Sequence, residues 1–191
     1  MSKFFQSIFH FNNCDFYPPV PDEIDLRNRL PRRNLNKLKV LNVGVGLGGS
    51  GLGRQLPFLR FKRLDNIDVF QPYLDGAKSR FYDAEKVSFI NADIRDFDTS
   101  IYDWVLMFDV LEHLPKEDSF RVLDKIKCSQ LIFIPLEKEF RENTFNAKSQ
   151  DHLSFWTEED FKNRGYATEV LSGFHREGEK VFDALWAVKQ K

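Results

Sequence analysis

The residues best suited to chemistry form a glycine-rich segment that directly follows a short apolar run. The run covers residues 39–43, and five glycines fall within the next eight residues, 44–51. Glycine lets the backbone turn sharply and approach a ligand closely, because no Cβ stands in the way. If a helix follows, its free N–H groups point into the loop. The segment therefore predicts a nucleotide-like ligand at the carboxyl end of a buried strand.

The glycine spacing fits two kinds of cofactor site. Gly44, Gly46 and Gly49 match the dinucleotide fingerprint, whereas Gly44, Gly46 and Gly48 match the loop of S-adenosylmethionine-dependent methyltransferases. Asp68, at the end of the next expected strand, is placed to bind ribose hydroxyls in both cases. A turn without a ligand is the third interpretation, but so many glycines cost conformational entropy on folding. The loop by itself leaves the cofactor open.

The elements that must position this loop alternate along the chain from residue 39 onward. Apolar runs predict strands at residues 40–43, 63–68, 87–90, 103–108 and 130–134. Helical spacing and end signals predict helices at residues 51–59, 71–80, 116–127 and 158–164, the last with Thr157 as its cap. Two final strands, 166–173 and 180–189, are expected to form a hairpin connected by residues 174–179. This order predicts an α/β fold with a Rossmann-like, doubly wound, mostly parallel seven-stranded sheet and a C-terminal antiparallel hairpin.

Length and composition fit one domain with a short extension. The chain has 191 residues, of which 42% are hydrophobic and 30% charged. Residues 39–191 are expected to form the ligand-binding domain, and residues 1–38 an N-terminal extension that packs on it. A basic phosphate-binding arm is the alternative for the extension, but neighbouring acidic residues favour a solvated mixed-charge face. The long loop at residues 136–156 is expected to overhang the site, since such loops are usually functional.

Charge and cysteine content exclude several kinds of partner. A net charge of −1 gives no general attraction to nucleic acid or to an acidic membrane. No apolar run approaches the length that spans a bilayer. Cys14 and Cys128 stand far apart, so we expect a reduced, cytoplasmic protein. The spacing of the four histidines and two cysteines indicates no metal site.

Four segments in order resemble the class I S-adenosylmethionine-dependent methyltransferases of the small-molecule type. They are residues 40–48, 66–69, 87–94 and 102–114, the last ending in Asp-Val-Leu-Glu-His-Leu. Residues 152–161 also resemble small-molecule members of this family, and the likeness covers residues 38–190. It implies methyl transfer from S-adenosylmethionine to a small molecule, such as a hydroxyl of a sugar or another metabolite. The alternatives are a nicotinamide-dependent oxidoreductase and a cofactor-binding module that has lost catalysis.

The resemblance implies cofactor contacts at the carboxyl ends of the first four strands. Gly44, Gly46 and Gly48 would admit the methionine part, Asp68 would accept hydrogen bonds from the ribose, and Asp93 would face the adenine amine. The implied set also includes Asn42, Val45, Val69, Ile94 and Asp109. The family usually has an acidic residue where this chain has Asn42, and an amide lacks the charge that helps to hold the amino group of the cofactor.

Two histidines are candidates for a general base, which is needed if the acceptor must lose a proton. His113 follows the fourth strand, where a hydrogen bond tying the loop to the sheet is the alternative role. His152 ends the long loop, where packing within the loop is the alternative. Relatives that methylate nucleic-acid bases carry an Asp/Asn-Pro-Pro-aromatic phrase after this strand. The corresponding residues here are Phe108-Asp109-Val110-Leu111, so we expect no nucleic-acid substrate.

Overall fold

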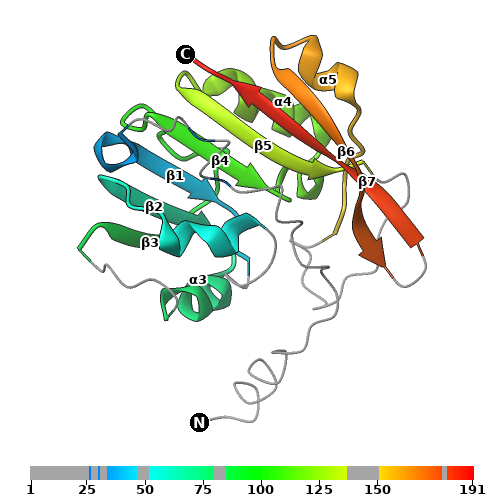
Figure 1. Ribbon diagram of the computed structural model, residues 1–191. Coiled ribbons are helices and arrows are strands. Elements are labelled where there is room, and N and C mark those ends of the chain that lie inside the picture. Colours follow the sequence, from blue (N-terminus) through cyan, green and yellow to red (C-terminus); the bar gives the residue numbers. More distant parts are fainter. Residues whose placement is uncertain are drawn as a thin grey trace, which may run out of the picture.

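A computed structural model describes residues 26, 30, 34–46, 52–79, 85–136, 151–177 and 180–191. These residues form a seven-stranded sheet with the strand order β3-β2-β1-β4-β5-β7-β6 (Figure 1). The strands are β1 (Lys39–Val43), β2 (Arg63–Asp68), β3 (Val87–Asn91), β4 (Trp104–Phe108), β5 (Ser129–Pro135), β6 (Ala167–Glu177) and β7 (Lys180–Lys189). Strands β1 to β5 pair in parallel, whereas β7 runs antiparallel to both β5 and β6. The predicted mostly parallel sheet with a terminal hairpin is confirmed.

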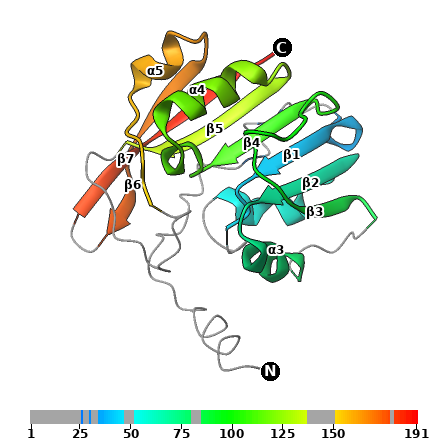
Figure 2. The same cartoon turned by 180° about the vertical axis from the view of Figure 1, so that it is seen from behind.

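Helical elements cover both faces of the sheet, which explains why its central strands are almost entirely buried. The 3₁₀ helix η3 (Leu52–Phe58) lies on one face, and α4 (Lys116–Lys125) and α5 (Glu158–Lys162) lie on the other (Figures 1 and 2). Helix α3 (Gln71–Lys78) packs beside β2 and β3, and the described residues also form the short 3₁₀ helices η2 (Leu35–Lys37) and η4 (Leu111–His113). Every residue of β4 and β5 is buried, as expected for strands covered on both faces. Within the described part of the chain, no helix has the length and apolar character needed to cross a bilayer.

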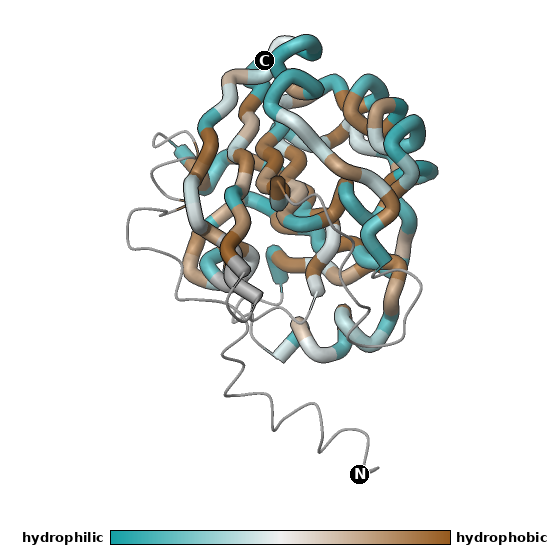
Figure 3. The backbone as a smooth tube through the Cα atoms, turned by 90° about the vertical axis from the view of Figure 1, so that its right-hand side faces the viewer, coloured by the Kyte–Doolittle hydropathy of each residue, from teal (hydrophilic) through white to brown (hydrophobic). Residues whose placement is uncertain are grey.

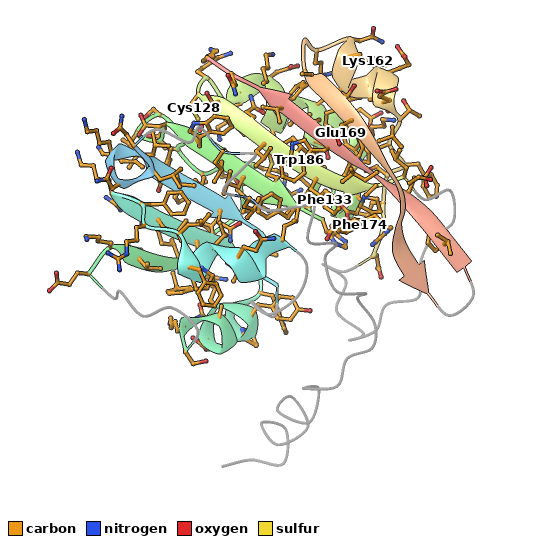
Figure 4. The ribbon with its side chains drawn as sticks, in the orientation of Figure 1. Cys128, Phe133, Lys162, Glu169, Phe174 and Trp186 are labelled. Carbon is orange, nitrogen blue, oxygen red and sulfur yellow. The ribbon has the colours of Figure 1, made fainter. Side chains whose placement is uncertain are left out.

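The core of the described residues consists of two large apolar layers, one on each face of the sheet, and a small third cluster at α3. Figure 3 shows that the hydrophobic stretches of the backbone gather in the interior. In the layer beneath η3, the Phe133 ring lies 4.8 Å from the Phe174 ring and 6.0 Å from the Trp186 ring (Figure 4). Leu26 and Leu30 belong to the same layer, and the Leu26 N–H donates to Oε1 of Gln55 at 2.8 Å. These two are the described residues among the first 33, so the predicted extension and its boundary at residue 38 stay predictions.

One local boundary expected from the sequence was wrong, and one predicted helix has a particular form. The helix predicted at residues 51–59 is a 3₁₀ helix at residues 52–58, since Gly53 and Pro57 both disfavour α-helix in so short a segment. Strand β6 continues past residue 173 to Glu177, because a bulge between Leu171 and His175 restores its pairing with β7. The predicted loop at 136–156 lies largely outside the described residues, which leave out 137–150.

Candidate functional site

The glycine loop leaves the carboxyl end of β1 with a backbone that favours glycine. Gly44 has φ +73° and Gly46 has φ +53°. A Cβ on Gly44 would lie 2.5 Å from Cγ2 of Val110, so this glycine allows the loop to press against the segment that follows β4. A Cβ on Gly46 would meet none of the described residues within 4 Å, so in this part of the chain it is the positive φ that favours glycine there. The predicted contact residue Gly48 lies outside the described residues.

Asp68, the last residue of β2, turns its buried carboxylate toward this loop. Its Oδ2 accepts from the N–H of Gly46 at 3.2 Å, and its Oδ1 accepts from the N–H of Phe70 at 2.8 Å. Burial raises the pKa of Asp68, although the backbone hydrogen bonds work in the opposite direction. An ionised carboxylate offers about four lone-pair positions, so it can accept further hydrogen bonds from a ligand.

Asn42 lies in β1 and is buried beside Asn66 of β2. Its Nδ2 donates to Oδ1 of Asn66 at 3.0 Å. Within the part of the chain that the structure describes, Oδ1 of Asn42 accepts no hydrogen bond. The position thus holds a neutral amide whose oxygen is available to a donor. Val45, just beyond β1, is buried against Leu74 and Ala77 of α3.

Asp93 follows β3 and is engaged by Arg95. Its carboxylate accepts from Nη2 of Arg95 at 2.6 Å and from the backbone N–H of the same residue at 2.9 Å. These hydrogen bonds hold the pKa of Asp93 below its ordinary value, despite partial burial. Arg95 also reaches Asp118 of α4 at 3.3 Å. The structure places a guanidinium next to this carboxylate, so its predicted adenine contact stays a prediction. The neighbouring Ile94 is buried, whereas Val69 is about half exposed.

Asp109 follows β4 with a left-handed backbone, φ +52°. Its N–H donates to the carbonyl of Phe133 in β5 at 2.9 Å, which holds this backbone at the carboxyl edge of the sheet. Aspartate tolerates that conformation better than most residues, but the conformation still costs free energy. Gly44 and Asp109 thus both have left-handed backbones, at the carboxyl ends of β1 and β4. At the end of β2, Asp68 contributes a buried carboxylate.

The structure brings the two predicted histidines together. The His113 and His152 rings lie 4.8 Å apart between centroids, at 80° to each other. Nδ1 of His113 lies 3.2 Å from the carbonyl oxygen of Asp151. The carboxylate of Glu112 completes the group, and one donor atom from each of the three residues lies within 4.8 Å of the others. Sequence reasoning missed Glu112, although its place directly before His113 was a usable signal.

Comparison with known protein families decides which cofactor this edge of the sheet serves. Residues 42–128 match the family model described as methyltransferase domain. These residues are a methyltransferase domain, and the prediction of an S-adenosylmethionine-dependent methyltransferase is confirmed. Its cofactor is therefore S-adenosylmethionine, and the nicotinamide alternative that the glycine loop left open is set aside. No curated protein sequence matches this methyltransferase.

Solved structures share the fold of this methyltransferase at low sequence identity. A putative S-adenosylmethionine-dependent methyltransferase from Listeria monocytogenes has a TM-score of 0.60 at 15% identity, covering 87% of this chain and 96% of its own. Magnesium protoporphyrin IX methyltransferase from Synechocystis PCC 6803, with bound S-adenosylmethionine, has a TM-score of 0.56 at 18% identity, covering 82% and 72%. The N-methyltransferase NodS from Bradyrhizobium japonicum WM9 has a TM-score of 0.55 at 14% identity, covering 82% and 88%.

Proposed function

We propose that this methyltransferase methylates a small-molecule acceptor, and that the acceptor group is a hydroxyl of a sugar or another metabolite. The observation that carries the proposal is the pairing of His113 with His152, because a neutral hydroxyl must lose its proton and imidazole is suited to take it. The names of similar structures support a small-molecule acceptor, since they include methyltransferases of magnesium protoporphyrin IX and of plantazolicin.

The described residues fit S-adenosylmethionine at the ends of β1 and β2. Among the described residues, nothing fills the space that a Cβ of Gly46 would take, which leaves room for the methionine part, and the unpartnered oxygen of Asn42 can accept from an amino group. The carboxylate of Asp68, fixed by two backbone N–H groups, would accept from the ribose hydroxyls. In this proposal, Asp93 and Ile94 flank the adenine. Gly44, Val45, Gly48, Val69 and Asp109 form the rest of the binding surface.

In this proposal, His113 or His152 takes the proton that the acceptor hydroxyl loses. When bound, S-adenosylmethionine supplies a methyl group made electrophilic by a sulfonium. The residues of this chain must therefore orient the acceptor oxygen, exclude water and remove a proton. The carbonyl of Asp151 can only accept, so Nδ1 of His113 carries a hydrogen, and in a neutral imidazole Nε2 is then the nitrogen that can take a proton. That nitrogen, or a ring nitrogen of His152, takes the hydroxyl proton as the oxygen becomes methylated.

The cofactor assignment can be tested by thermal unfolding in the presence of S-adenosylmethionine, its demethylated product and NADH. We expect the first two ligands to raise the midpoint, because a ligand that binds only the folded state stabilises it. Asp68→Asn should weaken that binding by about 10- to 100-fold, since a hydrogen bond to a charged group contributes about 1.5–3 kcal/mol. Asp75→Asn, at an exposed position on α3, is the matched control. A rise with NADH alone, or unchanged affinity in Asp68→Asn, would contradict the assignment.

The acceptor class needs a second measurement, with isotopically labelled methyl groups and matched hydroxyl and amine acceptors. Label should appear in hydroxyl compounds, and turnover should fall in His152→Ala while cofactor affinity stays unchanged. His175→Ala, at a histidine on β6, is the control. Transfer to amines alone would show that the proposed acceptor is wrong while leaving the cofactor site intact.

A further inference from the structure

Glu112, His113 and His152 form a compact set of nitrogen and oxygen donors at the carboxyl edge of the sheet. Glu112 and His113 belong to η4, and His152 comes from a segment 39 positions further along the chain, counting from His113. Glu112 is 2% exposed and His152 is 9% exposed. One donor atom from each residue lies within 4.8 Å of the other two. A carboxylate and two imidazoles held this close together can bind a positively charged ion.

The ring orientation of His113 provides an independent indication of what that charge is. Its Nδ1 lies 3.2 Å from the backbone carbonyl oxygen of Asp151, which can only accept a hydrogen bond. Nδ1 is therefore the protonated nitrogen, and Nε2 presents its lone pair elsewhere. Histidines that bind metals have this arrangement almost always, since the second ring nitrogen donates to a carbonyl, a carboxylate or water.

The backbone around the three side chains is firmly held. The N–H groups of Leu153 and Ser154 donate to the carbonyl of Glu112 at 2.7 and 3.1 Å. The carbonyl of Leu111 accepts from the hydroxyls of Ser119 and Ser154, at 3.0 and 3.1 Å. Three of these hydrogen bonds fasten the segment that carries His152 onto η4, and the one from Ser119 joins α4 to η4. A preorganised backbone of this kind is what a metal site requires of its supporting residues.

We propose that Glu112, His113 and His152 bind one divalent transition-metal ion. Two imidazoles and one carboxylate suit zinc, cobalt or iron(II), whereas magnesium and calcium prefer sites made of oxygen alone. Metal–ligand bonds of about 2.0–2.2 Å set donors about 3–3.5 Å apart. Side-chain rotation closes the remaining distance. Three protein ligands leave coordination positions open for an oxygen of the acceptor, and this consequence alone rests on the proposed function. In the metal-bound protein the two imidazoles are ligands and not bases, and the ion would instead promote loss of the hydroxyl proton to water.

The test is a titration of the full-length, metal-free protein with Co²⁺ alone, followed by visible absorption and metal analysis. We expect one Co²⁺ per chain, displaced by Zn²⁺ and unaffected by excess Mg²⁺. Glu112→Gln and His152→Ala should each weaken binding by more than about 100-fold, because losing even an outer partner of a ligand costs about 10- to 100-fold. His175→Ala is the control for a stray histidine site and should bind as the wild type does.

Each outcome separates this inference from the methyltransferase assignment. A protein that responds to S-adenosylmethionine but binds no Co²⁺, or whose Glu112→Gln and His152→Ala variants bind Co²⁺ normally, would overturn the metal site alone. If Glu112→Gln does not fold, His113→Asn takes its place, because its amide can still donate toward Asp151 while Nε2 is removed. Its loss of Co²⁺ binding with an intact unfolding transition would support the site, and retained binding would overturn it.

Discussion

At the scale of single residues, Gly44 and Gly46 both have positive φ, but only Gly44 also lies too close to a neighbour to carry a Cβ. Gly44→Ala adds both a left-handed alanine and a 2.5 Å contact with Val110, whereas Gly46→Ala adds only the first. The conformation costs about 1–2 kcal/mol for a residue with a Cβ. Overpacking adds about 1–3 kcal/mol at Gly44. Urea denaturation should therefore show that Gly44→Ala is the more destabilised of the two, and an equal loss would contradict the close approach of Val110.

Asp68 predicts a pH dependence of cofactor binding. Burial raises the pKa of its carboxyl, so protonation begins at a higher pH than for an ordinary aspartate. The charged form is the better acceptor for ribose hydroxyls, so affinity for S-adenosylmethionine should fall as pH is lowered from about 7 toward about 4. Calorimetric titration of wild type and Asp68→Asn checks this. The variant should bind weakly with little pH dependence, and a wild-type affinity that does not change over this range would contradict the prediction.

The raised pKa of Asp68 has the opposite effect on the stability of the cofactor-free protein: protonation stabilises the fold, although it weakens cofactor binding. A carboxyl whose folded pKa is raised contributes stability below its ordinary pKa, and that contribution is lost as pH rises through the folded value. The residue best placed to bind the cofactor is thus one whose charge disfavours the unliganded fold.

At the scale of elements, the stability of α5 depends on the hydrogen bonds that cap its first turn. The N–H of Asp160 donates to Oγ1 of Thr157, and the N–H of Thr157 donates to the Asp160 carboxylate at 2.8 Å. That carboxylate also accepts from Nζ of Lys116 at 2.7 Å, which links α5 to α4. Thr157→Ala should reduce the free energy of unfolding by about 1 kcal/mol, whereas Thr157→Ser keeps the hydroxyl and should lose little. Chemical denaturation distinguishes them, and equal stability of the two variants would show that the cap contributes nothing.

The hairpin shows why element boundaries could be predicted only in part. Residues 166–189 alternate in a way that indicates two strands, and both strands form. The bulge that prolongs β6 depends on partners in β7: the hydroxyl of Ser172 and the N–H of Gly173 both donate to Oδ1 of Asp183. A glycine in a strand indicates a turn or a bulge equally well, and only the pairing partner decides between them.

At the scale of the whole molecule, carboxylates held by cations predict acid lability. Hydrogen bonds from Arg95 hold the pKa of Asp93 below its ordinary value, and those from Arg121 and Arg95 do the same for Asp118. Stability from such groups is present above the ordinary carboxyl pKa and is lost as pH falls through the lower folded value. The free energy of unfolding should therefore decline below about pH 4. Arg95→Gln should flatten that decline and Arg60→Gln, at an exposed position, should not; identical pH profiles would contradict the prediction.

The sequence by itself determined the order of strands and helices along the chain, the place of the glycine loop after the first strand, and the place of Asp68 at the end of the second. Those features depend on local signals: apolar runs set the strands, glycine permits the left-handed turn at Gly44, and Asp68 ends the strand whose neighbour carries that turn. The resemblance to methyltransferases needed no more than these segments in their order, and the family match confirmed it.

Only the tertiary structure decided how distant residues meet. Nothing in the spacing of His113 and His152 indicates that their rings lie 4.8 Å apart, or that Glu112 joins them, because the contact is made by a segment folding back onto η4. The contact between Arg95, in the segment that follows β3, and Asp118 of α4 likewise depends on the tertiary structure. Local patterns fix which backbone conformations are favourable, whereas the site's donors converge only after the sheet brings the carboxyl ends of its strands to one edge.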